Sequence, residues 1–312
     1  YLDVHNHIFN ISQDHIALIK IADYDGNDYQ VLDKYSKLVT IKKDMTASEQ
    51  NGVTTKLMDY IKKRGKQMTE IFAHRGASGY APENTMDAFK LAVKQGAEGI
   101  ELDVQLSKDG IPVVIHDETI DRVTNGHGYV KDYTLEELKN FTIMKGKYQE
   151  YEHSKIPTLE EVLVYAKKES LTVNIELKTG IYWYPEIEEK TVDLVKKTKM
   201  EDQVIYSSFN HYSIRKIKEI APQAETAYLY SDVILQIDKY AKNEGVNGLH
   251  PAVYHVKMAH FLKEYLQSGL KVRVWTVNQE SDLKMLIDSG ITAVITNYPD
   301  KARMIRDESE RG

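Results

Sequence analysis

From about residue 71 onward, short apolar runs alternate with amphipathic segments, which is typical of a parallel α/β fold. Between the apolar runs, positions three and four apart predict helices, as at Met86, Phe89 and Val93 before a stop at Gly96. Eight strand–helix units over roughly 240 residues fit a (β/α)8 TIM barrel better than an open sheet. The predicted strands are 71–75, 99–106, 172–178, 203–207, 225–229, 246–249, 271–276 and 291–296.

One segment after the second strand breaks this repeat. The run 107–117, SKDGIPVVIHD, returns as a second β-rich stretch after only a Lys-Asp-Gly turn. That connection is too short for a crossover, so we expect a hairpin. Taking Asp109-Gly110 as a two-residue turn places Asp103 directly opposite His116 on the antiparallel ladder.

Two further regions stand outside the strand–helix repeat. Residues 118–158 are mixed and polar, and we interpret them as an insertion over the mouth of a barrel domain at 71–312. Residues 1–70 are interpreted as an N-terminal extension or linker. Within it, strands are expected at 15–24 and 29–42, a turn at 49–52 and a helix at 54–64.

The composition excludes several classes of function. A formal charge of -6 gives no general attraction to nucleic acid, so phosphate binding has to be local. The absence of cysteine excludes disulfides, thiolate metal sites and cysteine nucleophiles. No apolar run reaches about 18 residues, so nothing in the given residues is expected to span a bilayer. Because the sequence begins at Tyr1 without a signal-peptide pattern, we expect a processed product or a fragment of something longer.

Acidic residues on the predicted strands suggest a metal site. Glu101 and Asp103 are two apart in one strand, so their carboxylates share a face. A solvated face is the common explanation of such a pair, but a barrel would bury this strand, and a buried unpaired carboxylate is costly. A divalent ion between the carboxylates relieves the repulsion. Glu176, at the end of the NIELK strand, can supply a third oxygen ligand, which favours Ca²⁺ or Mg²⁺ over zinc.

Basic side chains are expected near the same place. His74 and Arg75 end the first strand, where they can serve as a proton-transfer group and a phosphate fork. His116 would lie beside Asp103, although a structural histidine is an equal interpretation. Lys178 projects on the same side as Glu176, where an ammonium for phosphate competes with an ordinary surface lysine.

Several ordered motifs resemble one enzyme family. HRGASGYAPENTMDAF, GIELDVQLSKDGIPVVIHD, NIELK and VRVWTVN, within about residues 71–306, are similar to the glycerophosphodiester phosphodiesterases. The resemblance implies metal-dependent hydrolysis of a glycerophosphodiester to sn-glycerol 3-phosphate and an alcohol, by water or through a cyclic phosphate. It implies an acid/base pair in His74 and His116, metal ligands in Glu101, Asp103 and Glu176, phosphate contacts in Arg75 and Lys178, and glycerol-pocket walls in Phe209 and Trp275. For the two aromatic residues, core packing is an equal interpretation.

The resemblance leaves the substrate's alcohol and the setting of the chain open. Deacylated phospholipids and polyglycerophosphate present the same local diester. Relatives in Gram-positive bacteria carry this domain behind a membrane-spanning part, so a membrane tether before residue 1 and a freely soluble chain are both compatible with the sequence.

Two competing functions deserve comparison. Asp3, His5 and His7 imitate the DxHxH of amidohydrolase barrels, which would require both histidines on one strand face, but no strand–helix repeat follows them for some 60 residues. A barrel that has lost catalysis and acts as a binding module is the other alternative, and the full set of histidines and carboxylates argues against it.

Overall fold

The computed structural model describes residues 2–4, 7–9, 20–24, 28–32, 38–42, 68–143, 151, 153–258 and 260–311. The chain divides into two compact units, Tyr1–Met68 and Thr69–Gly312. The first unit contains a two-stranded and a three-stranded antiparallel sheet. Its strands are β1 (Leu2–Val4), β2 (His7–Phe9), β3 (Lys20–Tyr24), β4 (Asp28–Leu32) and β5 (Leu38–Lys42). The turn expected at 49–52 and the helix expected at 54–64 lie outside the described residues.

The hairpin at the start of the chain removes the basis of the amidohydrolase interpretation. Val4 in β1 pairs with His7 in β2, and Asp3 pairs with Ile8, so Asp3 and His7 belong to two antiparallel strands. The amidohydrolase alternative would require one strand to carry the pattern, and the structure places Asp3 and His7 on two. His5 itself lies outside the described residues.

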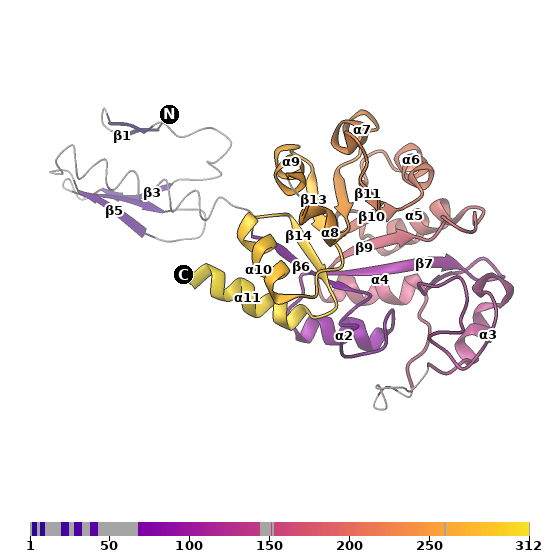
Figure 1. Cartoon of the computed structure of the whole chain (residues 1–312). Coiled ribbons are helices and arrows are strands. Elements are labelled where there is room, and N and C mark those ends of the chain that lie inside the picture. The colour runs from indigo at the N-terminus through magenta and orange to yellow at the C-terminus, as the bar shows by residue number, and fades with distance from the viewer. Residues whose placement is uncertain are drawn as a thin grey trace. The chain divides into compact units, whose positions relative to one another are not determined.

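The second unit is a closed parallel barrel (Figure 1). Its strands follow the order β6-β14-β13-β12-β11-β10-β9-β7, and β6 pairs with β7 to close the ring. This confirms the predicted (β/α)8 barrel, and each predicted strand overlaps an observed one. The barrel strands are β6 (Glu70–His74), β7 (Gly99–Leu106), β9 (Thr172–Leu177), β10 (Val204–Ser208), β11 (Glu225–Tyr230), β12 (Gly248–Pro251), β13 (Lys271–Val274) and β14 (Ala293–Thr296).

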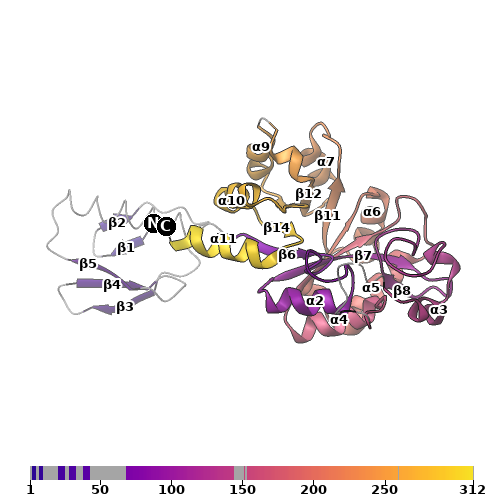
Figure 2. The ribbon, with the colours of Figure 1, turned by 60° about the horizontal axis from the view of Figure 1, so that its bottom comes forward.

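Helices between the strands surround the barrel (Figures 1 and 2). They begin at local signals in the sequence: the Thr85 hydroxyl caps α2, and Thr158 with Glu161 forms a capping box at α4. Within the described ranges, none of the helices is both long and apolar enough to cross a membrane. The helices are α2 (Met86–Lys94), α3 (Leu135–Asn140), α4 (Leu159–Lys168), α5 (Ile187–Thr198), α6 (His211–Ile220), α7 (Ile237–Asn243), α8 (Val253–Val256), α9 (Phe261–Gln267), α10 (Glu280–Ser289) and α11 (Pro299–Arg311).

The core has layers inside and outside the barrel. Phe72, Ile205, Ala227, Ala293 and Ile295 fill the barrel interior as one buried cluster. Larger clusters join the outward faces of the strands to the helices. The segment after β8 has a small core of its own, which includes Ile115, Ile120, Val130, Leu138, Ile143 and Ile156. Figure 1 shows this segment, with α3, beyond the carboxyl end of β7.

The hairpin after β7 exists, but its predicted register is wrong. β8 (Pro112–Val114) pairs antiparallel with β7, and Val104 faces Val114. Ser107 and Ile111 close a three-residue turn in which Gly110 adopts a φ of +75°. The extra turn residue moves the ladder by one position, so Asp103 pairs with Ile115 through a 3.0 Å backbone bond and not with His116.

Candidate active site

Three carboxylates meet at the carboxyl ends of neighbouring strands. Glu101 and Asp103 lie on β7, and strand pairing places Glu176 of β9 directly beside Asp103. All three side chains are buried, and one oxygen of each lies within 4.8 Å of the others. Parallel strands thus gather in one place carboxylates that are up to 75 residues apart in sequence, as the spacing within β7 predicted for the first two.

The charges of this acidic trio, Glu101, Asp103 and Glu176, are unbalanced. Burial and the neighbouring carboxylates raise the pKa of Glu101 well above its usual value and that of Glu176 to about 7. Burial also acts to raise the pKa of Asp103, but Arg75, His116 and Lys178 hold it below its ordinary value. Asp103 Oδ1 is buried and accepts no hydrogen bond among the described residues. An orphaned oxygen amid three hard donors fits a divalent cation.

His74 ends β6 with one ring nitrogen fixed and the other directed at the trio. Its Nδ1 lies 2.7 Å from Asn297 Oδ1, so this nitrogen carries the proton and donates to the amide oxygen. Nε2 lies 3.9 Å from Glu101 Oε2. Burial, with a smaller effect of Arg75, lowers the pKa of His74 to about 4, so the ring is neutral at pH 7.

Arg75 and Lys178 bring positive charge to the trio from two strands. Arg75 Nε lies 3.3 Å from Asp103 Oδ2, and the Arg75 backbone N–H donates to Glu101 Oε2 at 3.1 Å. Lys178 Nζ lies 3.0 Å from Glu176 Oε1 and 3.9 Å from Asp103 Oδ1. Burial acts to lower the pKa of Lys178, but these two carboxylates raise it, so the ammonium stays charged.

His116 follows the hairpin strand β8 and is held at both backbone and ring. Its Nδ1 lies 2.6 Å from Asp117 Oδ1. The amide nitrogen of Gln105 lies between 2.6 and 3.1 Å from the carbonyl oxygens of Ile115, His116 and Asp117. Although the ladder register was wrong, His116 directly follows Ile115, the backbone partner of Asp103, and its carbonyl accepts from Gln105, two residues beyond Asp103 on β7.

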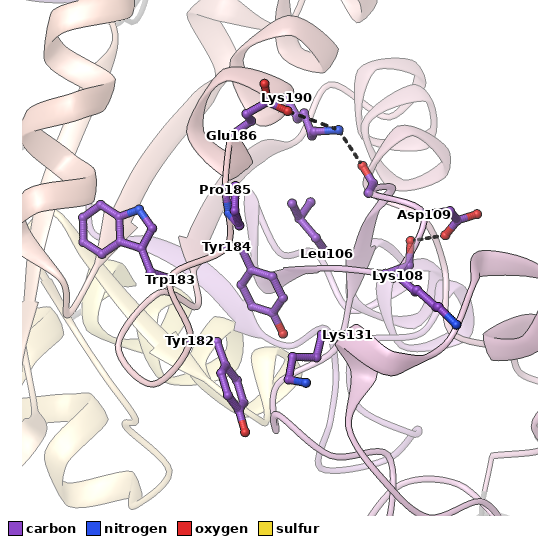
Figure 3. Close-up of a pocket in the computed structure, with 12 residues that line it drawn as sticks. Leu106, Lys108, Asp109, Lys131, Tyr182, Trp183, Tyr184, Pro185, Glu186 and Lys190 are labelled. Carbon is purple, nitrogen blue, oxygen red and sulfur yellow. Dashed lines mark hydrogen bonds and ion pairs between the residues drawn. The ribbon is translucent and has the colours of Figure 1, made fainter.

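A pocket lies beside the hairpin, and a residue of its wall supports the backbone near His116 (Figure 3). Its volume is about 500 Å³, and it lies between the β7–β8 turn and the loop before α5. Tyr184 forms part of its wall and donates from its hydroxyl to Gln105 Oε1 at 2.8 Å. The buried Tyr184 and Gln105 therefore connect the pocket wall to the backbone that carries His116.

Phe209 and Trp275 form a separate aromatic pair. Their rings are 5.5 Å apart in an edge-to-face arrangement. Trp275 packs against the interior cluster and donates from Nε1 to the His250 carbonyl at 2.7 Å, whereas Phe209 is 40% exposed. Core packing thus describes Trp275 better than Phe209, and the role of both in a glycerol pocket stays a prediction.

Sequence reasoning missed the residues that orient the predicted ones. Asn84 donates to Asp103 Oδ2 at 2.8 Å, and Asn297 accepts from His74. Gln105 had a signal, because it lies two residues beyond Asp103 on the same face of β7. Glu83 and Arg122 also reach the site, and their contacts depend on how distant segments pack.

Comparisons with known proteins point to one enzyme family. Residues 74–301 match the model of the glycerophosphoryl diester phosphodiesterase family. A glycerophosphodiester phosphodiesterase of Bacillus altitudinis is 45% identical over 246 residues, which is 77% of this chain and 99% of the relative. One from Caldanaerobacter subterraneus subsp. tengcongensis is 43% identical over 232 residues, or 74% and 95% of the two chains.

A solved structure extends the similarity to the fold. An Oleispira antarctica phosphodiesterase in complex with the product sn-glycerol-3-phosphate superposes with a TM-score of 0.72 at 32% identity. The match covers 77% of this chain and 97% of that protein. The family match, the sequence relatives and the fold together show that this chain belongs to the glycerophosphoryl diester phosphodiesterase family.

Proposed function

We propose that this enzyme hydrolyses glycerophosphodiesters to sn-glycerol 3-phosphate and an alcohol, with Ca²⁺ or Mg²⁺ held by the acidic trio. The observation that carries the proposal is the cluster of three buried carboxylates within 4.8 Å, flanked by His74 and by two cationic side chains. The related Oleispira antarctica enzyme binds sn-glycerol-3-phosphate, the product expected here.

The donor set favours a hard cation. Glu101, Asp103 and Glu176 offer only carboxylate oxygens, which suit Ca²⁺ and Mg²⁺ better than they suit zinc. A bound divalent ion would polarise a phosphoryl oxygen and stabilise charge in the transition state. The three carboxylates would hold the ion at the place where Arg75 and Lys178 also converge.

His74 is suited to be the general base. Asn297 accepts from Nδ1, so the lone pair of the neutral ring lies on Nε2, which faces the trio. Because its pKa is lowered to about 4, this nitrogen is free to accept a proton at neutral pH. It would take a proton from the attacking water, or from the neighbouring glycerol hydroxyl in a cyclic route whose phosphate ring water then opens, a step worth roughly 10²- to 10⁴-fold.

His116 is suited to be the general acid. Asp117 is a carboxylate that only accepts, so His116 Nδ1 is the donor in their 2.6 Å contact. With its ring protonated, His116 would give the Nε2 proton to the leaving alkoxide. Arg75 and Lys178 would meanwhile bind the non-bridging phosphate oxygens. Phe209 and Trp275 are proposed as walls for the glycerol group.

The decisive experiment measures glycerol 3-phosphate release from a panel of glycerophosphodiesters. The panel contains glycerophosphocholine, glycerophosphoethanolamine and a polymeric glycerophosphate, so it also identifies the preferred alcohol. Chelator should abolish release, and Ca²⁺ and Mg²⁺ restored separately should distinguish the preferred ion. His116→Ala should lower kcat by at least 10²-fold on a substrate with an alkoxide leaving group.

Two results would contradict this proposal. If the parent releases no glycerol 3-phosphate from any member of the panel with either ion, catalysis is excluded and the binding module becomes the better account. If turnover survives chelation, the acidic trio is not the centre of the reaction.

A further inference from the structure

The guanidinium of Arg122 binds two carboxylates at once. Its Nε and NH2 lie 2.6 and 3.0 Å from the two oxygens of Asp117. Its NH1 and NH2 lie 2.8 and 2.7 Å from the two oxygens of Glu83. Both contacts are bidentate, an arrangement that fixes orientation as well as distance and that a lysine cannot reproduce.

Each of those carboxylates holds one proposed functional group. Asp117 binds His116 at Nδ1, and Glu83 binds Arg75 NH1 at 3.0 Å. Arg75 in turn reaches Asp103 of the acidic trio. The result is a network of side-chain contacts that runs from the His116 ring through Asp117, Arg122, Glu83 and Arg75 to Asp103.

This network joins segments that no single helix or strand holds together. Arg75 follows β6, Glu83 precedes α2, Asp117 follows β8, and Arg122 lies in the segment after β8. Hydrogen bonds to Arg122 lower the pKa of Asp117 to about 2 despite its partial burial, so this carboxylate keeps its charge at neutral pH. The ring of His116 and the fork of Arg75 are therefore fixed relative to each other through one side chain.

We propose that Arg122 is a positioning residue that aligns His116 and Arg75 on the same phosphodiester. This inference rests on the proposed function and extends it to a residue with no part in the chemistry itself. Positioning groups outside the reacting shell commonly change activity 10- to 100-fold. A small displacement of either group would be enough, because catalysis depends on near-attack geometry.

A simple surface ion pair is the alternative, and it predicts a different result. Arg122 has a 48% exposed side chain, and exposed pairs contribute little to folding stability. Removing Arg122 should therefore leave the fold intact while kinetics change. Arg215 offers a matched control: its side chain is 51% exposed and binds Glu244 at 3.1 and 3.0 Å, away from the site on α6.

The experiment compares R122Q, R122K, D117N, E83Q and the control R215Q on the best substrate of the panel. R122Q should lower kcat/KM by roughly 10- to 100-fold with both a lower kcat and a higher KM. D117N should act mainly on kcat, because it disturbs His116, and E83Q mainly on KM, because it disturbs Arg75. R122K should recover little, and R215Q should match the parent.

Coupling between the variants provides a sharper readout. If Arg122 acts through Asp117, D117N should cost less in the R122Q background than in the parent. Thermal unfolding checks that each variant is folded. Full activity in R122K, parent-like kinetics in R122Q, or additive losses in the double variant would overturn the proposal.

A measurement without turnover separates this inference from the proposed function. Ring ¹⁵N spectra, recorded at a pH high enough to keep imidazole rings neutral, report the tautomer of His116, assigned by comparison with H116Q. The parent and R215Q should show a protonated Nδ1, while R122Q should show mixed tautomers as Asp117 loses its anchor. An inactive parent with this same tautomer change would overturn the proposed function and leave the positioning network standing; an unchanged tautomer in R122Q would count against Arg122.

Discussion

Two groups of charged side chains lie at opposite ends of the barrel, on different strands, and they differ in how their charges are matched. At the carboxyl ends, the acidic trio brings three carboxylates within 4.8 Å of one another. At the amino ends of β11 and β13, the basal cluster of Glu225, Lys271 and Arg273 places two cations 2.5 Å from one carboxylate. The two regions share a scaffold and differ in charge balance.

The pKa directions reveal the consequence of that balance. Burial raises the pKa of Glu176 to about 7, and the neighbouring carboxylate adds to the effect. Burial has the same effect on Glu225, but Arg273 and Lys271 reverse it and hold the pKa below the ordinary value. A carboxylate flanked by cations serves the fold, whereas buried carboxylates that outnumber the cations beside them mark a place for something that binds.

The largest expected effect is on activity. Glu101→Gln keeps the shape and the acceptor for the Arg75 backbone N–H but removes a charge from the acidic trio. Loss of a metal ligand should lower kcat/KM by roughly 10³-fold, since the ion supplies several kcal/mol in the transition state. Steady-state kinetics at saturating Ca²⁺ or Mg²⁺ measure the loss.

The stability of the same variant should move the other way. Without metal, Glu101→Gln removes like-charge repulsion and should unfold at a higher temperature than the parent. Glu225→Gln is the matched control and should keep parent-like kcat/KM. A fully active Glu101→Gln variant would show that the trio is not the metal site.

The contrast between the two regions also explains what could be predicted from sequence. Glu101 and Asp103 were predictable because a strand has a period of two and the burial of β7 follows from its apolar neighbours. The ladder register failed because one further turn residue, invisible in the Lys-Asp-Gly pattern, moves every later pair.

Contacts between distant loops had no local signal. The Arg122–Glu83 contact joins residues 39 apart through two loops whose paths depend on tertiary packing. Basal pairing was hidden for a related reason, because Glu225 and Arg273 meet only once β11 and β13 have both paired with β12. Periodicity therefore identifies which face a residue occupies, and packing decides its partner.

The second effect is on folding. Glu225→Gln leaves Arg273 without a full counter-charge. The Arg273 side chain is buried in the barrel, where its guanidinium lies near the Phe72 ring. Breaking a fully buried pair costs about 3–5 kcal/mol, and the partial exposure of Glu225 lowers the expected loss to about 2–3 kcal/mol. Denaturant unfolding of the metal-free protein measures it, with Glu101→Gln as the variant of opposite sign. A loss below about 0.5 kcal/mol would mean that the basal cluster is a surface pair of little weight.

The smallest effect, and the most specific to the acidic trio, is the pH dependence of metal binding. Below pH 7 the metal-free Glu176 holds a proton that the ion has to displace, so affinity should fall by up to about tenfold per pH unit as pH decreases. The raised pKa of Glu101 acts in the same direction, so affinity should level off only once both carboxylates are charged. Calorimetry of Ca²⁺ and Mg²⁺ binding in buffers of different ionisation enthalpy counts the released protons directly. Glu225→Gln should show the parent's pH curve, whereas equal affinity at pH 6 and pH 8 in the parent would mean that the ion does not meet the excess charge of the trio.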